Sequence, residues 1–187
     1  MGKVVVTEFV TLDGVIEDPG GAESFDRGGW AFKFDQGDEG GAFKFAELQA
    51  ADAQLLGRRT YEGFAKAWPT MEGTGEFGEK MNAMPKFVVS STLEDPEWEN
   101  TTVLRGELAD EVAALKERFA GDILVAGSAQ LVQGLLAADL IDELHLMVFP
   151  AVLGAGKRLF ADGDAMRSLS LVETKQTADV VIHTLRR

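Results

Sequence analysis

Apolar residues along the chain fall into short runs, with longer stretches of helical spacing between them. Runs of consecutive β-branched or apolar residues, bounded by polar or glycine-rich segments, are typical of buried strands. They predict strands at 3–10, 52–57, 86–92, 101–104 and 123–126. Elsewhere apolar residues recur every three or four positions, as on one face of a helix. This spacing predicts helices at about 39–51, 58–68, 108–119 and 129–138.

The pattern changes after Asp139. Residues 143–149 alternate between apolar and other side chains, which is typical of a strand with two unlike faces. Residues 169–175 and 179–185 predict a final hairpin, and the glycine-rich, acidic segment 70–79 is expected to be a loop. Strands and helices thus alternate first, and only strands follow. This order predicts one α/β domain over 1–187, with a mostly parallel sheet covered on both faces and antiparallel C-terminal strands.

Composition narrows the class of partner. The chain has 187 residues and a net charge of −13, so long-range repulsion argues against nucleic acid or an anionic membrane as partner. It contains no cysteine, which removes disulfides, thiolate catalysis and cysteine metal sites. No apolar run has the length of a membrane span or a signal core, so a cytoplasmic protein is expected. An anionic ligand would need a local basic pocket.

Three predicted strands end in groups that suit an anion. Arg58, Arg59 and Thr60 follow one strand, and the hydroxyls of Ser90, Ser91 and Thr92 end another. The third strand leads into Gly127, Ser128 and Ala129, where glycine permits close approach and Ser128 is expected to cap the next helix. The carboxyl ends of parallel strands share one edge of a sheet. Two phosphate positions with a basic cluster suit a dinucleotide, and an extra 2′-phosphate would explain the arginines, which favours NADPH.

The first strand leads into a long glycine-rich loop and then an aromatic segment. Asp13-Gly14 reads either as an ordinary tight turn or as a ligand contact at a strand end. Residues 25–45 are rich in aromatic side chains, which fit core filling, a subunit interface or the wall of a pocket for a flat ligand. The histidines His145 and His183 lie on predicted strands and give only weak grounds for a metal-dependent hydrolase. No metal site is expected.

The order and spacing of five segments resemble those of the dihydrofolate-reductase-like superfamily. These segments are 11–14, 55–61, 88–91, 125–128 and 150–156, and they cover nearly the whole chain. The resemblance is closest to the reductase domain of riboflavin biosynthesis and its stand-alone bacterial relatives. It implies a three-layer α/β/α dihydrofolate-reductase-like fold that binds NADPH extended along the sheet edge. It also implies a homodimer.

The resemblance implies roles for particular residues. Residues 58–60 would contact the adenosine phosphates, Ser90 and Ser91 the 2′-phosphate and adenine, and 127–130 the pyrophosphate. Leu12 and Asp13 would lie beside the nicotinamide and the substrate. Together with the strand-end pattern, this gives as expected cofactor-binding residues Leu12, Gly57, Arg58, Arg59, Thr60, Ser90, Ser91, Thr92, Ala126, Gly127, Ser128, Ala129 and Gln130.

The expected chemistry is hydride transfer to a small heterocycle of the pterin or aminopyrimidine type, such as 5-amino-6-(5-phosphoribosylamino)uracil. Asp13 is the first candidate to orient the substrate or relay a proton, with Asp35 and Asp38 behind it. Trp30 and Phe34 are the candidates for the substrate-binding wall. Two alternatives stay open: a non-catalytic NADPH-binding dimeric scaffold, and a dihydrofolate reductase proper.

Overall fold

An eight-stranded mixed sheet forms the centre of the molecule in a computed structural model, which describes residues 1–163 and 166–187. The strand order is β4-β3-β2-β5-β1-β6-β8-β7. The strands are β1 (Lys3–Thr11), β2 (Ala51–Gly57), β3 (Lys86–Val89), β4 (Thr101–Leu104), β5 (Asp122–Val125), β6 (Glu143–Phe149), β7 (Ser170–Thr177) and β8 (Val180–Arg186). The helices are α1 (Gly37–Ala50), α2 (Arg58–Ala67), α3 (Gly75–Ala83), α4 (Leu108–Arg118) and α5 (Ala129–Ala137), with short 3-10 turns η1 (Trp30–Lys33) and η2 (Trp68–Thr70).

The strands from β4 to β6 in this order pair in parallel, and β8 and β7 are antiparallel additions at the β6 edge. The predicted mostly parallel sheet with antiparallel C-terminal strands is therefore confirmed. Each parallel strand needs a crossover, and the helices that supply the crossovers cover the sheet. No helix in the described part of the chain is both long and apolar enough to cross a membrane.

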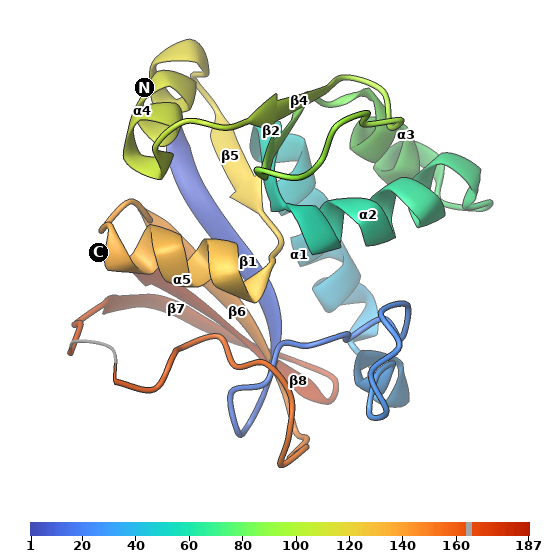
Figure 1. Cartoon of the computed structure of the whole chain (residues 1–187). Coiled ribbons are helices and arrows are strands. Elements are labelled where there is room, and N and C mark those ends of the chain that lie inside the picture. The colour runs from blue at the N-terminus through green and yellow to red at the C-terminus, as the bar shows by residue number, and fades with distance from the viewer. Residues whose placement is uncertain (164–165) are drawn as a thin grey trace.

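Helices cover both faces of the sheet, which gives three layers (Figure 1). On one face, α4 and α5 pack onto inward side chains such as Val4, Val6 and Val125. On the other face, α1, α2 and α3 pack onto Val5, Leu56 and other residues of the alternate set. Because side chains alternate along a strand, neighbouring residues of β1 point to different layers.

The expectation of a loop over 70–79 is wrong in its second half, because α3 begins at Gly75. Glycines predicted the loop, but packing stabilises a helix here. Phe77 of α3 stacks on Trp68 with ring centroids 5.4 Å apart, and Met81 is buried against α2 and the sheet. A Cβ on Gly78 would lie 1.9 Å from Thr74 Oγ1, so the glycine is what lets the first turn close. Tertiary packing here outweighs local propensity.

The central strands are of unequal length, and this shapes the edge of the sheet. The register pairs Val6 of β1 with Val125, the last residue of β5. Beyond that point β1 continues to Thr11 beside β6. The carboxyl end of β5 therefore opens onto the side of β1, at the level of Glu8. This difference in length leaves a step in the edge of the sheet, between Glu8 of β1 and the residues from Ala126 that follow β5.

Candidate functional site

Four neighbouring strands deliver their carboxyl ends to one edge of the sheet. The residues that follow them are Arg105 after β4, Ser90 after β3, Arg58 after β2 and Ala126 after β5. All four strands run parallel, so these residues form a row. With neighbouring strands about 4.8 Å apart, the row is about 14 Å long. The edge thus brings together the three groups of residues that the sequence predicted.

The ends of β2 and β5 approach each other closely, and two glycines make this possible. A Cβ on Gly57 would lie 2.1 Å from Ser128 Oγ, and one on Gly127 would lie 2.9 Å from Thr60 Oγ1. Gly127 has φ +91°, a conformation that favours glycine, and its carbonyl accepts a hydrogen bond from Gly57 N at 3.3 Å. The Gly127–Ser128 peptide bond is cis. The two helix starts are therefore held side by side.

Both helices begin at this edge without a side-chain cap. Ser128 is the N-cap residue of α5, but its hydroxyl makes no capping hydrogen bond, so the expected cap is wrong. The first turn of α2 contains no acidic residue. Instead Arg58 Nη1 lies 2.9 Å from Glu62 Oε1, one turn further along the helix. That exposed pair partly offsets the unfavourable position of an arginine at a helix start. The backbone N–H groups of the two first turns suit an anion.

Arg59 is exposed, and its charge acts on Glu17 in the loop that follows β1. Burial favours the neutral form of Glu17 in that loop, but Lys157, whose Nζ lies 2.6 Å from Glu17 Oε1, and more distantly Arg59 hold the pKa of Glu17 below its ordinary value. Arg58, Arg59 and Lys157 thus place three positive charges near this edge in a chain of net charge −13, two of them paired with Glu62 and Glu17.

At the far end of the row, Ser90 shapes a turn and Arg105 joins it. Ser90 Oγ accepts hydrogen bonds from the N–H groups of Thr92 and Leu93 at 3.2 and 3.0 Å, which is the capping use of a hydroxyl. Ser91 and Thr92 are exposed. Arg105 donates to the carbonyl oxygens of Ser90 and Leu93 at 3.3 and 2.5 Å. The sequence analysis missed Arg105, although it directly follows a predicted strand, as Arg58 does.

The step beside β5 holds a buried carboxyl group that the sequence analysis also missed. Glu8 is 8% exposed, and its Oε1 has no hydrogen-bond partner among the described residues. A Cβ on Gly127 would lie 3.6 Å from that oxygen, so the carboxyl faces the Gly127 turn. Burial raises the pKa of Glu8 to about 8, against the positive charge of Lys44. In the sequence, the signal for this group was a glutamate among the mostly apolar residues of a predicted buried strand.

Asp13 ties two loops together. Its carboxylate accepts hydrogen bonds from Thr11 Oγ1 at 2.6 Å and from the N–H groups of Leu153 and Gly154 at 3.1 and 2.7 Å. The hydrogen bond from Thr11, with those from Gly154 and Leu153, outweighs burial and lowers the pKa of Asp13 to about 2. The carboxyl is therefore ionised at neutral pH and holds the two loops together, and its expected role in orienting the substrate or relaying a proton stays a prediction. Leu12 beside it is 65% exposed.

Replacing Asp13 by asparagine should loosen the loop that follows β6. The neutral asparagine accepts weaker hydrogen bonds from the N–H groups of Leu153 and Gly154 than the ionised aspartate does. We therefore expect the amide hydrogens of these two residues to exchange roughly tenfold faster. Because the folded-state pKa is lowered from 3.8 to about 2, the same loop in the wild type should hold above pH 3.8 and loosen as the pH falls toward 2. Hydrogen exchange measures both effects. Equal exchange in Asp13→Asn and in the exposed control Asp26→Asn would refute this role.

The aromatic segment divides between core and surface. Trp30 is 1% exposed, its Nε1 donates to the carbonyl of Glu17 at 2.9 Å, and its ring packs edge-on against Phe149. The expectation that Trp30 contacts substrate is thus corrected, because the ring is part of the core. Phe34 is half-buried, packs on the same Phe149 and also lines an open hollow of about 590 Å³.

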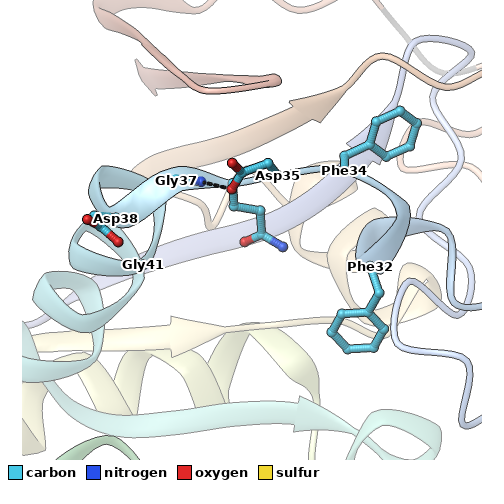
Figure 2. A pocket seen from close by; sticks show the side chains of 7 residues that line it. Phe32, Phe34, Asp35, Gly37, Asp38 and Gly41 are labelled. Carbon is cyan, nitrogen blue, oxygen red and sulfur yellow. Dashed lines mark hydrogen bonds between the residues drawn. The ribbon is translucent and has the colours of Figure 1, made fainter.

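Asp35 and Asp38, the two further candidates for orienting the substrate or relaying a proton, line that hollow (Figure 2). Phe32 and Phe34 lie at one end, and Asp38 and Gly41 on the first turns of α1 lie at the other. Asp35 Oδ1 accepts a hydrogen bond from Gly37 N at 2.8 Å, so this carboxylate shapes the start of α1. Both aspartates lie at the surface, and the start of α1 contacts the β7–β8 turn. In the sheet, β1 and β6 lie between β5 and the β7–β8 hairpin, so the structure does not bring these carboxylates to the Gly127 turn.

A polar network lies under α1, on the face of β1 opposite Glu8. Glu47 joins Lys44 at 2.6 Å, His145 Nδ1 at 2.7 Å and Thr7 Oγ1 at 3.0 Å. Burial favours the neutral form of Glu47, but Lys44 and His145 hold its pKa below the ordinary value. His183 of β8 does not join this network. It pairs with Leu146, the neighbour of His145 on β6, so the two histidine side chains point to opposite faces of the sheet.

The eight-stranded mixed sheet with helices on both faces has the dihydrofolate-reductase-like fold. The chain belongs to the RibD C-terminal domain family, whose model matches residues 2–183.

A relative and two solved structures are similar to the chain. The chain is 30% identical to the uncharacterised protein YwjB of Bacillus subtilis (strain 168) over 98% of each chain. It resembles the crystal structure of a putative riboflavin biosynthesis protein from Shewanella sp. PV-4, with TM-score 0.78 and 24% identity over 99% and 98% of the two chains. The dihydrofolate reductase of Enterococcus faecalis, solved with NADP(H), matches with TM-score 0.59 and 18% identity over 100% and 96%. The predicted family and fold are confirmed.

Proposed function

We propose that the protein is an NADPH-dependent reductase that transfers a hydride to a small heterocycle of the pterin or aminopyrimidine type. The observation that carries this proposal is the row formed by Arg105, Ser90, Arg58 and Ala126 at one sheet edge. Basic side chains, hydroxyls and two helix starts follow one another there, and each of these groups suits a phosphate. Family membership supports the reductase class.

The residues at this edge fit the cofactor. Arg58 and Arg59 would hold the adenosine phosphates, Ser90 the 2′-phosphate, and Gly127 and the start of α5 the pyrophosphate. Gly127 has no side chain, and the space that a Cβ would occupy adjoins Thr60 and Glu8. When bound there, NADPH supplies the hydride.

The chain itself would contribute orientation and shelter from water. Asp13 holds the loop after β6 against the loop after β1, with Leu12 exposed at its tip. We infer that Leu12 and these loops border the substrate, because they rise from the ends of β1 and β6 next to the step. A compound such as 5-amino-6-(5-phosphoribosylamino)uracil suits the proposal in chemical class. We also infer a homodimer in the cytoplasm, supported by exposed apolar side chains such as Leu171 on the edge strand β7.

The test is to incubate the protein with NADPH and a panel of pterins and aminopyrimidines, and to follow absorbance of the nicotinamide band. The proposal predicts saturable NADPH binding and a loss of that absorbance with at least one member of the panel. Binding without any loss across the panel would favour the non-catalytic scaffold. Turnover of dihydrofolate alone would favour a dihydrofolate reductase proper. Failure to bind NADPH would refute all three readings.

A further inference from the structure

Glu8 is the one buried carboxyl group at the step, among the described residues, whose position has no structural explanation. An unpaired polar atom in the interior weakens folding, because it gives up its hydrogen bonds to water without replacing them. Glu8 is 8% exposed and its Oε1 has no partner in the part of the chain that the structure describes. By contrast, the buried Glu47 is held by Lys44 and His145. A buried group left unsatisfied in this way points to a ligand as its partner.

The surroundings of Glu8 define what kind of ligand group could pair with it. Its Oε1 and Thr60 Oγ1 both lie beside the space that a Cβ on Gly127 would occupy, at 3.6 and 2.9 Å from it. The charges that act on it are Lys44 of α1 and Glu23 of the loop after β1, and burial outweighs both. Burial therefore keeps the carboxyl protonated at neutral pH. A protonated carboxyl both donates one hydrogen bond and accepts another, side by side.

A primary carboxamide offers the complementary pair, with a carbonyl oxygen that accepts and an N–H group that donates. The nicotinamide ring of NADPH carries one. We propose that Glu8 recognises the carboxamide of the nicotinamide ring through this paired hydrogen bond, and so sets the position of the ring at the step. This inference rests on the proposed function, because it requires NADPH to bind along the row.

Protonation of Glu8 should make NADPH affinity depend on pH. The pKa of Glu8 is raised from 4.5 to about 8, so its carboxyl loses its donor as the pH rises through about 8. The ionised form can only accept, and it would also repel the neighbouring phosphates. NADPH affinity should therefore fall above pH 8. Because the folded state favours the protonated form, protein stability should also decline as the pH rises from 4.5 to about 8.

The test measures binding by calorimetry for three ligands: NADPH, its 3-acetylpyridine analogue, in which a methyl group replaces the amide nitrogen, and 2′,5′-ADP, which lacks the nicotinamide. Glu8→Met removes both hydrogen bonds at similar size and should weaken NADPH about tenfold, with 2′,5′-ADP unchanged. The acetylpyridine analogue should bind the wild type more weakly than NADPH, and this preference should disappear in Glu8→Met. The thermal midpoint of Glu8→Met should equal or exceed that of the wild type, since an unpaired polar group has gone.

Glu8→Gln serves as the second variant, because its amide keeps a donor and an acceptor but does not titrate. It should retain NADPH affinity and keep that affinity constant from pH 7 to 9.5, where the wild type weakens. Equal NADPH affinity in Glu8→Met and the wild type, or the same pH profile in Glu8→Gln and the wild type, would overturn the inference alone. If the wild type bound neither NADPH nor 2′,5′-ADP, the proposed function would fail together with it.

Discussion

Replacing Gly127 by alanine is expected to lower NADPH affinity more than tenfold and to destabilise the fold by about 2 kcal/mol. The glycine has φ +91°, which an L side chain rarely adopts. Its added Cβ would lie 2.9 Å from Thr60 Oγ1, so the turn must move away from α2. That movement would separate the two helix starts that are held side by side at the edge. Binding calorimetry and urea unfolding measure the two effects.

Gly63→Ala is the matched control for this substitution. Gly63 lies inside α2, on the same helix as Thr60, and nothing lies within 4 Å of the position that an alanine methyl group would take there. Alanine at this position should stabilise the protein by about 0.5–1 kcal/mol and leave NADPH affinity unchanged. If Gly127→Ala bound NADPH as tightly as Gly63→Ala, the Gly127 turn would not be part of the cofactor site.

Removing both arginines at the start of α2 is expected to weaken NADPH binding by about 100-fold or more. Each charge-assisted hydrogen bond to a phosphate contributes about 1.5–3 kcal/mol, and the Arg58→Ala/Arg59→Ala variant loses at least one from each side chain. The affinities for NADPH and NADH should fall by similar factors, because the two arginines would hold adenosine phosphates that both cofactors carry. The wild-type affinity should also weaken with added salt, and this dependence should be smaller in the variant.

Lys66→Ala provides the control for the change in charge. Lys66 is exposed in the last turn of the same helix, about 10 Å from the arginines along the axis. Its removal alters net charge by one but leaves the edge intact, so NADPH affinity should stay within about twofold of the wild type. A double arginine variant that behaved like Lys66→Ala would show that Arg58 and Arg59 are only solvated surface charges.

The sequence predicted the sheet edge because that prediction needs only local patterns and one topological rule. Apolar runs located the strands, and parallel strands bring their carboxyl ends together. Arg58, Ser90 and Gly127 therefore come together in the structure as expected. The same rule applied to the strand 101–104 would have included Arg105. The positions of strand ends can therefore be predicted from sequence more reliably than the contacts that side chains make.

The features that the sequence did not reveal depend on contacts between distant segments. The helix α3 forms in spite of its glycines because Phe77 stacks on Trp68. Trp30 is buried because Phe149, far along the chain, lies against it. Asp13 is ionised and fixed because the loop at Leu153 donates to it, and no local pattern around Asp13 contains that information. Each of these outcomes was decided by packing that local propensity cannot anticipate.

Glu8 is a different case, because its signal was present in the sequence. A carboxylate at an inward position of a strand that is buried on both faces must be paired, neutral or functional. The run from Val4 to Val10 contained this residue, and the alternation of side chains places it on the layer of Val4 and Val6. What the sequence could not supply was the neighbour, since the contact with Gly127 depends on where β5 ends.

A crystal structure with NADPH bound would test the central claim most directly. The account predicts a cofactor extended along the sheet edge, with its 2′-phosphate near Ser90 and Arg105, its pyrophosphate at Gly127 and the start of α5, and its carboxamide at Glu8. NADPH seated elsewhere, such as in the hollow between Phe34 and Asp38, or a protein that binds no NADPH at all, would contradict it.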